Sequence, residues 1–88
     1  MSEFTARANG RDEAYSAVAY AVECWRSKPP KERRNFFNEQ HKEARSYSEM
    51  LVRQAEECDG TEEEIDLLYA RSQAHLARAE VYRQLALI

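Results

Sequence analysis

Two histidines are the first residues to consider for metal chemistry. His41 and His75 lie about one helical turn apart once the two helices expected to carry them are paired. A metal site between helices needs carboxylates one turn from each histidine. The flanking positions hold Phe37, Asn38, Ala44 and Arg45 around His41, and Arg71, Ser72, Arg78 and Ala79 around His75. Because neither set supplies a carboxylate, we expect histidines packed in a helix seam, with no metal and no cofactor.

Cysteine chemistry rests on two thiols, Cys24 and Cys58, which do not form a CxxC pair. We place Cys24 near one end of a helical hairpin and Cys58 at the other. That separation is several times the limit of about 7 Å that a disulfide sets between Cα atoms. The chain also lacks a glycine-rich phosphate loop and a nucleophile elbow. We therefore expect two free structural thiols and no enzymatic activity.

Acidic residues gather around one predicted turn, where no lysine or arginine lies between Gln54 and Ala70. The seven are Glu56, Glu57, Asp59, Glu62, Glu63, Glu64 and Asp66. The spacing of Glu63 and Asp66 resembles the carboxylate pairs of helical nucleotide pyrophosphohydrolases, but the facing helix offers only a poor second pair. Imitation of nucleic-acid phosphates is another alternative, weakly supported by a net charge of −3. Helix capping and solubility account for the cluster most simply.

Basic residues gather at the opposite end of the predicted hairpin. The candidate binding residues there are Trp25, Arg26, Lys28, Lys31, Arg33, Arg34 and Arg83. A helix that begins at Pro30 also points its N-terminus to this end, which favours an anion. These features predict binding of an acidic protein surface or of an anionic small ligand such as a nucleotide, whereas the overall acidity argues against extended nucleic-acid binding. The alternative is a solvated end whose cations cover Trp25.

Glycine and proline occur at only three places and divide the chain. Gly10, Pro29–Pro30 and Gly60 separate stretches rich in Ala, Glu, Arg, Gln and Leu, which are strong helix formers. No stretch alternates apolar and polar residues as a strand does. We predict an all-α fold in a single domain of residues 1–88, with helices at about 11–27, 30–58 and 62–87. Residues 2–8 are expected to form a separate helical turn, broken from the rest near Gly10.

Local signals define the turn between the second and third helices. Gly60 is expected to take the left-handed conformation that ends a helix. Thr61 and Glu64 have the spacing of a capping box, in which the threonine oxygen accepts from the third amide and the glutamate reaches back. The third helix is therefore expected to begin directly after Thr61.

The second and third helices carry apolar rows that match when the paired residue numbers sum to about 119 or 120. This rule places Phe37 opposite Tyr82 and Leu51 opposite Leu68, and it sets large residues against small ones along the seam. We predict an antiparallel helical hairpin with arms of about 40 Å. The first helix is expected to fold back and cover the half of the hairpin next to Pro29–Pro30.

Several apolar residues lie off this seam and indicate association. Met50, Val52, Leu67 and Tyr69 are the candidates for an oligomer interface, because the first helix is not expected to cover their half of the hairpin. The alternative is that residues 1–10 cover them within one chain. Either arrangement would add to the small core that a chain of 88 residues can build.

Composition and targeting signals limit the class of protein. The chain is 43% hydrophobic and 33% charged, which is typical of one small globular domain. It has no apolar run near the roughly 18 residues that span a bilayer, and its N-terminal residues do not resemble a signal peptide, so we expect a cytoplasmic protein without a membrane role. We predict a small non-enzymatic interaction or regulatory protein, of the kind that includes inhibitors, which self-associates and binds a partner macromolecule. The alternative is an oligomeric binder of an anionic small ligand at the basic end.

Overall fold

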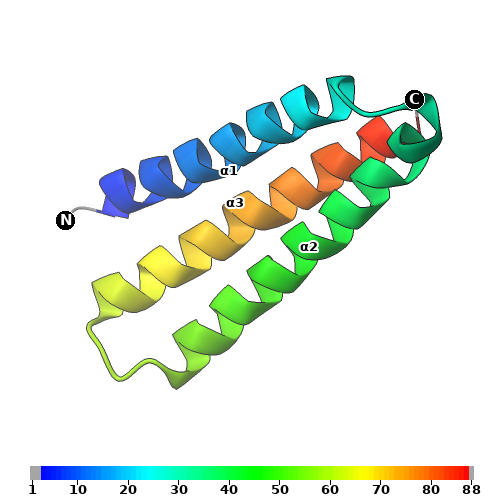
Figure 1. Ribbon diagram of the computed structural model, residues 1–88. Coiled ribbons are helices and arrows are strands. Elements are labelled where there is room, and N and C mark those ends of the chain that lie inside the picture. Colours follow the sequence, from blue (N-terminus) through cyan, green and yellow to red (C-terminus); the bar gives the residue numbers. More distant parts are fainter. Residues whose placement is uncertain (1–2, 88) are drawn as a thin grey trace.

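The structure is a computed structural model that describes residues 3–87, with the side chains of residues 10–33 and 35–87. Three helices form it: α1 (Glu3–Arg26), α2 (Pro30–Glu57) and α3 (Glu62–Ala86). Figure 1 shows α3 lying between the other two helices, with α1 running parallel to α3 and α2 antiparallel to both. No strand occurs among the described residues, which confirms the prediction of an all-α fold.

The register of the α2–α3 hairpin follows the predicted pairing. The rings of Phe37 and Tyr82 are stacked with centroids 6.1 Å apart. Further along, Ser48 and Ser72 exchange hydrogen bonds through their hydroxyls and backbone carbonyls, at 2.9 and 3.0 Å. Both pairs have residue numbers that sum to 119 or 120. Matching apolar rows on two helices were therefore sufficient to set which residues meet.

Helix α1 begins eight residues before the expected start and continues through Gly10. The reason lies in α3: a Cβ atom added at Gly10 would be 3.3 Å from the Cα atom of Arg71. Glycine here allows the two helices to approach closely, and its helix penalty of about 1 kcal/mol is not enough to break the helix. The expected break near Gly10 is therefore absent.

The turn between α2 and α3 differs from the expectation in its backbone. No described glycine has a positive φ, so the left-handed conformation expected for Gly60 was wrong. The helix ends because Cys58 takes an extended conformation. A Cβ atom at Gly60 would require the carboxylate of Glu64, the flexible end of that exposed side chain, to move aside. Thr61 caps α3 as predicted, its Oγ1 accepting from the Glu64 N–H at 3.2 Å.

The core is made mainly of small side chains. Among the described residues, the buried hydrophobic ones are Phe37, Leu51, Tyr82 and five alanines, Ala14, Ala21, Ala44, Ala55 and Ala79. Both of the buried hydrophobic residues that α1 contributes are alanines, and α1 packs along α3 while touching α2 at few places. Helices that meet through alanine approach closely but bury little apolar area, and larger side chains such as Trp25, Phe36 and Leu85 pack against this core while only partly buried.

Candidate interaction surfaces

A polar cluster joins all three helices at the middle of the molecule. Glu13 lies in α1, and its Oε1 atom accepts hydrogen bonds from three donors of the other two helices. They are His75 Nε2 at 2.9 Å, Arg71 Nη2 at 3.2 Å and the Tyr47 hydroxyl at 3.3 Å. Arg71 also donates to the Tyr47 hydroxyl at 2.7 Å. The Tyr47 ring meets the imidazole of His75 edge-on, with centroids 4.6 Å apart. Glu13 thus joins α1 to both arms of the hairpin through side-chain hydrogen bonds.

The arrangement around His75 is suited to holding helices together. Donation from Nε2 to a carboxylate fixes the imidazole tautomer, which leaves Nδ1 as an acceptor. The side chain is only 3% exposed, and Nδ1 has no hydrogen-bond partner among the described residues. Burial, which outweighs the bond to Glu13, lowers the pKa of His75 below its ordinary value of 6.5. The buried contact between His75 and Glu13 therefore links α3 to α1.

At the basic end, Arg33 is engaged with α1. Its guanidinium donates to the backbone carbonyls of Arg26 at 2.8 Å and Lys28 at 2.9 Å. It also lies over the Trp25 ring, 5.0 Å from the centroid. The last carbonyls of a helix lack partners within the helix, and a guanidinium is well suited to satisfy them. Arg33 therefore caps the C-terminus of α1 and covers its tryptophan.

The other predicted binding residues of this end have neighbours of their own. Lys28 lies over the ring of Phe36, and Arg26 pairs with Glu23 at 3.3 Å. Arg83 is brought to the same end of the hairpin, as expected, but pairs with Glu80. Lys31 is exposed, and the side chain of Arg34 lies outside the described residues. Anion binding at this end stays a prediction, and it would require several of these pairs to open.

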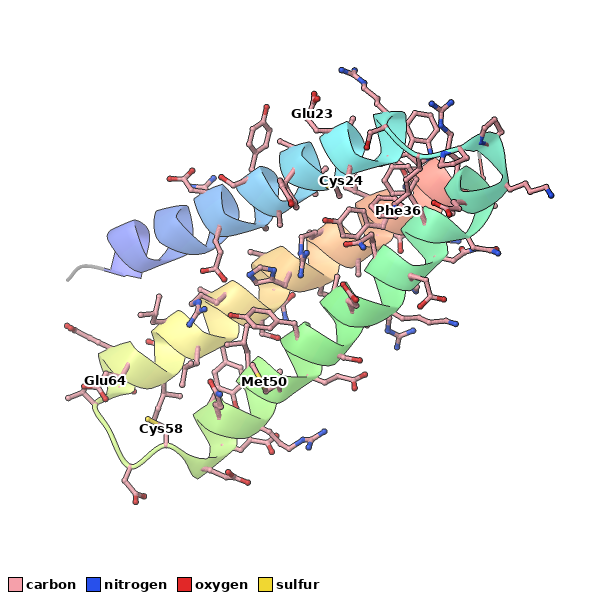
Figure 2. The ribbon with its side chains drawn as sticks, viewed as in Figure 1. Glu23, Cys24, Phe36, Met50, Cys58 and Glu64 are labelled. Carbon is pink, nitrogen blue, oxygen red and sulfur yellow. The ribbon has the colours of Figure 1, made fainter. Side chains whose placement is uncertain are left out.

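The two thiols do not form a disulfide, and the histidines make hydrogen bonds within the fold. Cys24 lies in α1 and Cys58 at the opposite end of the molecule, and both are free, as predicted (Figure 2). His41 uses its Nδ1 atom to bond the carbonyl of Ala79 at 2.9 Å. Among the side chains of residues 10–33 and 35–87, no group of three or more metal-ligating residues lies together.

The residues predicted for an oligomer interface are partly accessible. Met50 and Tyr69 are exposed, whereas Val52 and Leu67 are half-buried. Five other large hydrophobic residues are exposed in the structure: Tyr15, Tyr20, Leu76, Val81 and Leu87. Tyr20 and Leu87 also lie off the seam by sequence periodicity, whereas the sequence did not single out Tyr15, Leu76 and Val81 as exposed. By periodicity alone, the apolar row of the third helix can pass through either His75 or Leu76. Two adjacent helical positions differ by 100°, and the structure places His75 inside and Leu76 outside.

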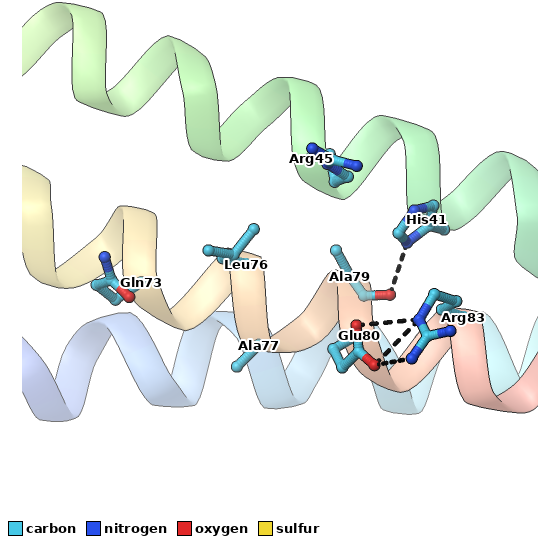
Figure 3. A pocket seen from close by; sticks show the side chains of 8 residues that line it. All are labelled: His41, Arg45, Gln73, Leu76, Ala77, Ala79, Glu80 and Arg83. Atoms are coloured by element: carbon cyan, nitrogen blue, oxygen red, sulfur yellow. Dashed lines mark hydrogen bonds and ion pairs between the residues drawn. The ribbon is translucent and has the colours of Figure 1, made fainter.

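An open groove runs along the hairpin, between α2 and α3. It consists of two hollows of about 620 and 370 Å³, which share Arg45, Gln73 and Leu76. Figure 3 shows the larger hollow, with His41 and Arg45 on the α2 side and Leu76 and Glu80 on the α3 side. None of the α1 side chains that the structure describes, residues 10–26, lines either hollow. The groove is thus a surface of the hairpin, with apolar and charged residues of both signs.

Comparison of the chain with protein-family models, with curated proteins and with solved structures found no match. Within the described residues, none of the three helices has a stretch both long and apolar enough to traverse a bilayer. The proposals below therefore rest on the residues and contacts of this chain.

Proposed function

We propose that this chain is a small non-enzymatic interaction protein that self-associates and binds a protein partner. One observation carries the proposal: the described core is built largely from alanine, while seven large hydrophobic side chains are exposed. A monomer of this size gains little from such a core, because apolar area removed from water is the main stabilising contribution. Exposed large hydrophobic side chains beside a core of mostly small ones are typical of a chain that buries them against another molecule.

The polar features support the same class of protein. The buried imidazole of His75 is engaged by Glu13 and has no hydroxyl or thiol bonded to its other nitrogen among the described residues. The hydroxyls of Ser48 and Ser72 bond one another. Nucleophilic catalysis requires a nucleophile within hydrogen-bond reach of its base, and this cluster does not supply that pair. These groups instead rigidify the helical surface that a partner would meet.

Self-association and partner binding are tested in sequence. Light scattering and sedimentation equilibrium of the purified chain across the micromolar range should give a mass that is a multiple of the monomer mass. A mass equal to the monomer at every concentration would contradict self-association.

The aromatic side chains of α1 offer a surface for the partner, because Tyr15 and Tyr20 are the most exposed tyrosines of the described chain.

A tagged chain should therefore recover a defined partner from its source cells, identified by mass spectrometry. Replacing Tyr15 and Tyr20 by serine should remove that partner while the mass of the self-associated form is unchanged. If the double variant recovers the same partner as the parent, the partner surface lies elsewhere.

A further inference from the structure

Helix α1 is held at its C-terminal end by large side chains. The ring of Trp25 lies against the ring of Phe37 with centroids 5.6 Å apart, and Val22 packs against the same core cluster. The guanidinium of Arg33, from α2, donates to the carbonyl of Arg26 at 2.8 Å. This end of α1 therefore has both buried apolar area and hydrogen bonds that keep it on the hairpin.

The first half of α1 is held differently, by small residues and one carboxylate. Ala14 is buried, and Gly10 lies so close to α3 that an added Cβ atom would be 3.3 Å from the Cα atom of Arg71. Such small residues bury little apolar area. At this level Glu13 is the described residue that bonds both arms of the hairpin, through three donors on one oxygen. The attachment of this half therefore depends on the hydrogen bonds of that carboxylate.

His75 makes its bond to Glu13 as a neutral imidazole. Its Nε2 atom donates to the carboxylate, and its Nδ1 atom is buried without a hydrogen-bond partner among the described residues. A proton added to the ring would go to Nδ1 and create a buried N–H donor without a described acceptor, on a ring that now carries a charge. The pKa of His75, which burial lowers, agrees with this geometry.

The charged and titratable groups around His75 come from all three helices, and on balance they oppose its protonation. Arg71 and Arg78 act on it from α3. Tyr47 meets its ring edge-on from α2, and Glu13 bonds it from α1. A protonated imidazole would be a third cation near a single carboxylate that already accepts from three donors. Because that carboxylate belongs to α1, withdrawal of α1 opens one side of the imidazole to water, which solvates the added charge.

We propose that the contact between Glu13 and His75 is an acid-sensitive connection, and that protonation of His75 releases the first half of α1 from the hairpin while the end at Trp25 stays packed. The released segment would also lose helical structure, since a short helix without packing partners is marginal in water. Its departure would uncover the side of α3 that Gly10 approaches, at Arg71. The inference goes beyond the proposed function, because neither a partner nor a second copy takes part in it.

Hydrogen exchange of the purified chain tests the release. Amide protection is measured residue by residue by NMR between neutral pH and about pH 5, and is corrected for the intrinsic pH dependence of exchange. The protection of residues 11–17 should fall by at least about threefold relative to that of residues 40–50 in α2, because the released state binds a proton that the packed state resists. The ring resonances of His75 should titrate over the same pH range as this loss.

A matched pair of histidine variants identifies the titrating group. His75→Gln keeps a side-chain N–H for Glu13 but has no imidazole to protonate, so residues 11–17 should stay protected over the whole range. His41→Gln is the control, because His41 bonds the carbonyl of Ala79 within the hairpin. This control should retain the pH dependence of the parent. Circular dichroism at neutral pH should show the helical content of the parent in both variants.

Several outcomes would overturn the proposal. Protection of residues 11–17 that is the same at neutral and acidic pH excludes the release. A parallel loss of protection in all three helices indicates global unfolding in place of a separate movement of α1. A loss that persists in His75→Gln assigns the effect to another group. If His75→Gln does not fold, the parent decides, because a loss of protection without titration of His75 over the same range also overturns the assignment.

Discussion

The Oε1 atom of Glu13 lies 2.9 Å from the Nε2 atom of His75, and this contact joins α1 to α3 at the middle of the molecule. Both residues titrate, and both have a shifted pKa. Burial raises the pKa of Glu13, but hydrogen bonds from Arg71 and His75 outweigh it and bring the pKa below the ordinary value of 4.5. Burial lowers the pKa of His75 below 6.5, and the nearby cations Arg78 and Arg71 act in the same direction.

These shifts predict that acidification weakens the fold. Below pH 6.5 the unfolded chain binds a proton at His75 that the folded chain resists, so the stability falls as the pH falls. Glu13 acts in the same direction below pH 4.5. Urea denaturation between neutral pH and about pH 5, the range where histidine normally titrates, should show the loss of stability that His75 causes. His75→Gln, which keeps a donor for Glu13, should flatten this part of the profile. A parent whose stability is constant or rises over this range would contradict the assignment.

Removal of the Glu13 carboxylate should loosen α1 more than the hairpin. Glu13→Ala leaves the donors of His75 and Arg71 without their shared acceptor, and we expect a loss of about 1 kcal/mol, since the site is partly open to water. Hydrogen exchange should become faster in α1 and change little in α2 and α3. Glu23→Ala is the control on the same helix, because Glu23 only pairs with the exposed Arg26. If Glu13→Ala and Glu23→Ala changed hydrogen exchange in α1 equally, Glu13 would not be holding α1 to the hairpin.

Arg33 distinguishes a helix cap from an anion site. Arg33→Lys keeps the positive charge but loses the planar group that bonds two carbonyls and covers Trp25. We expect Arg33→Ala and Arg33→Lys to destabilise the fold by a similar amount, about 1 to 2 kcal/mol, and to shift the fluorescence of Trp25 to longer wavelength. Lys31→Ala, at an exposed position, should change neither. If instead nucleotides raise the melting temperature and Arg33→Lys keeps both this shift and the parent stability, the anion-binding alternative is favoured.

Leu51 should be the most sensitive position of the hairpin seam. It is a large, fully buried aliphatic side chain, and Leu51→Ala should cost about 2 to 5 kcal/mol. Leu68, its predicted opposite, is only half-buried, so Leu68→Ala should cost clearly less. Chemical denaturation of the two variants measures this difference. A loss at Leu51 as small as that at Leu68 would argue against the observed register.

The contrast between Leu51 and Leu68 illustrates what the sequence could predict. The hairpin and its register were accessible because two apolar rows must match over many turns, and a shift of one residue would spoil every pair. Burial at each position was harder to predict, because it depends on where the third helix lies. The sequence predicted that the first helix packs against the hairpin, and the structure places it on the α3 arm through small residues such as Ala14 and Ala21.

The surfaces were less predictable than the seam for a related reason. The cluster of basic residues was evident, but Arg33 bonds the carbonyls of Arg26 at the end of α1 and of Lys28 just after it, and carbonyl acceptors leave no signal in the side-chain pattern. The polar cluster around Glu13 combines residues from three helices, which no local spacing reveals. The groove depended on whether His75 or Leu76 faces inward, and adjacent apolar and polar residues left that choice open. Long-range contacts decided all three cases.

The parallel packing of α1 on α3 sets the order in which the chain can fold during synthesis. The first helix leaves the ribosome before its packing partner has been made, because α3 follows both α1 and α2 in the sequence. Domains are built from the N-terminus at about 5 to 20 residues per second. For several seconds α1 therefore has only α2 beside it, with which it shares few contacts. The three helices can pack together only after α3 has been synthesised, because α1 and α2 both make most of their contacts with α3.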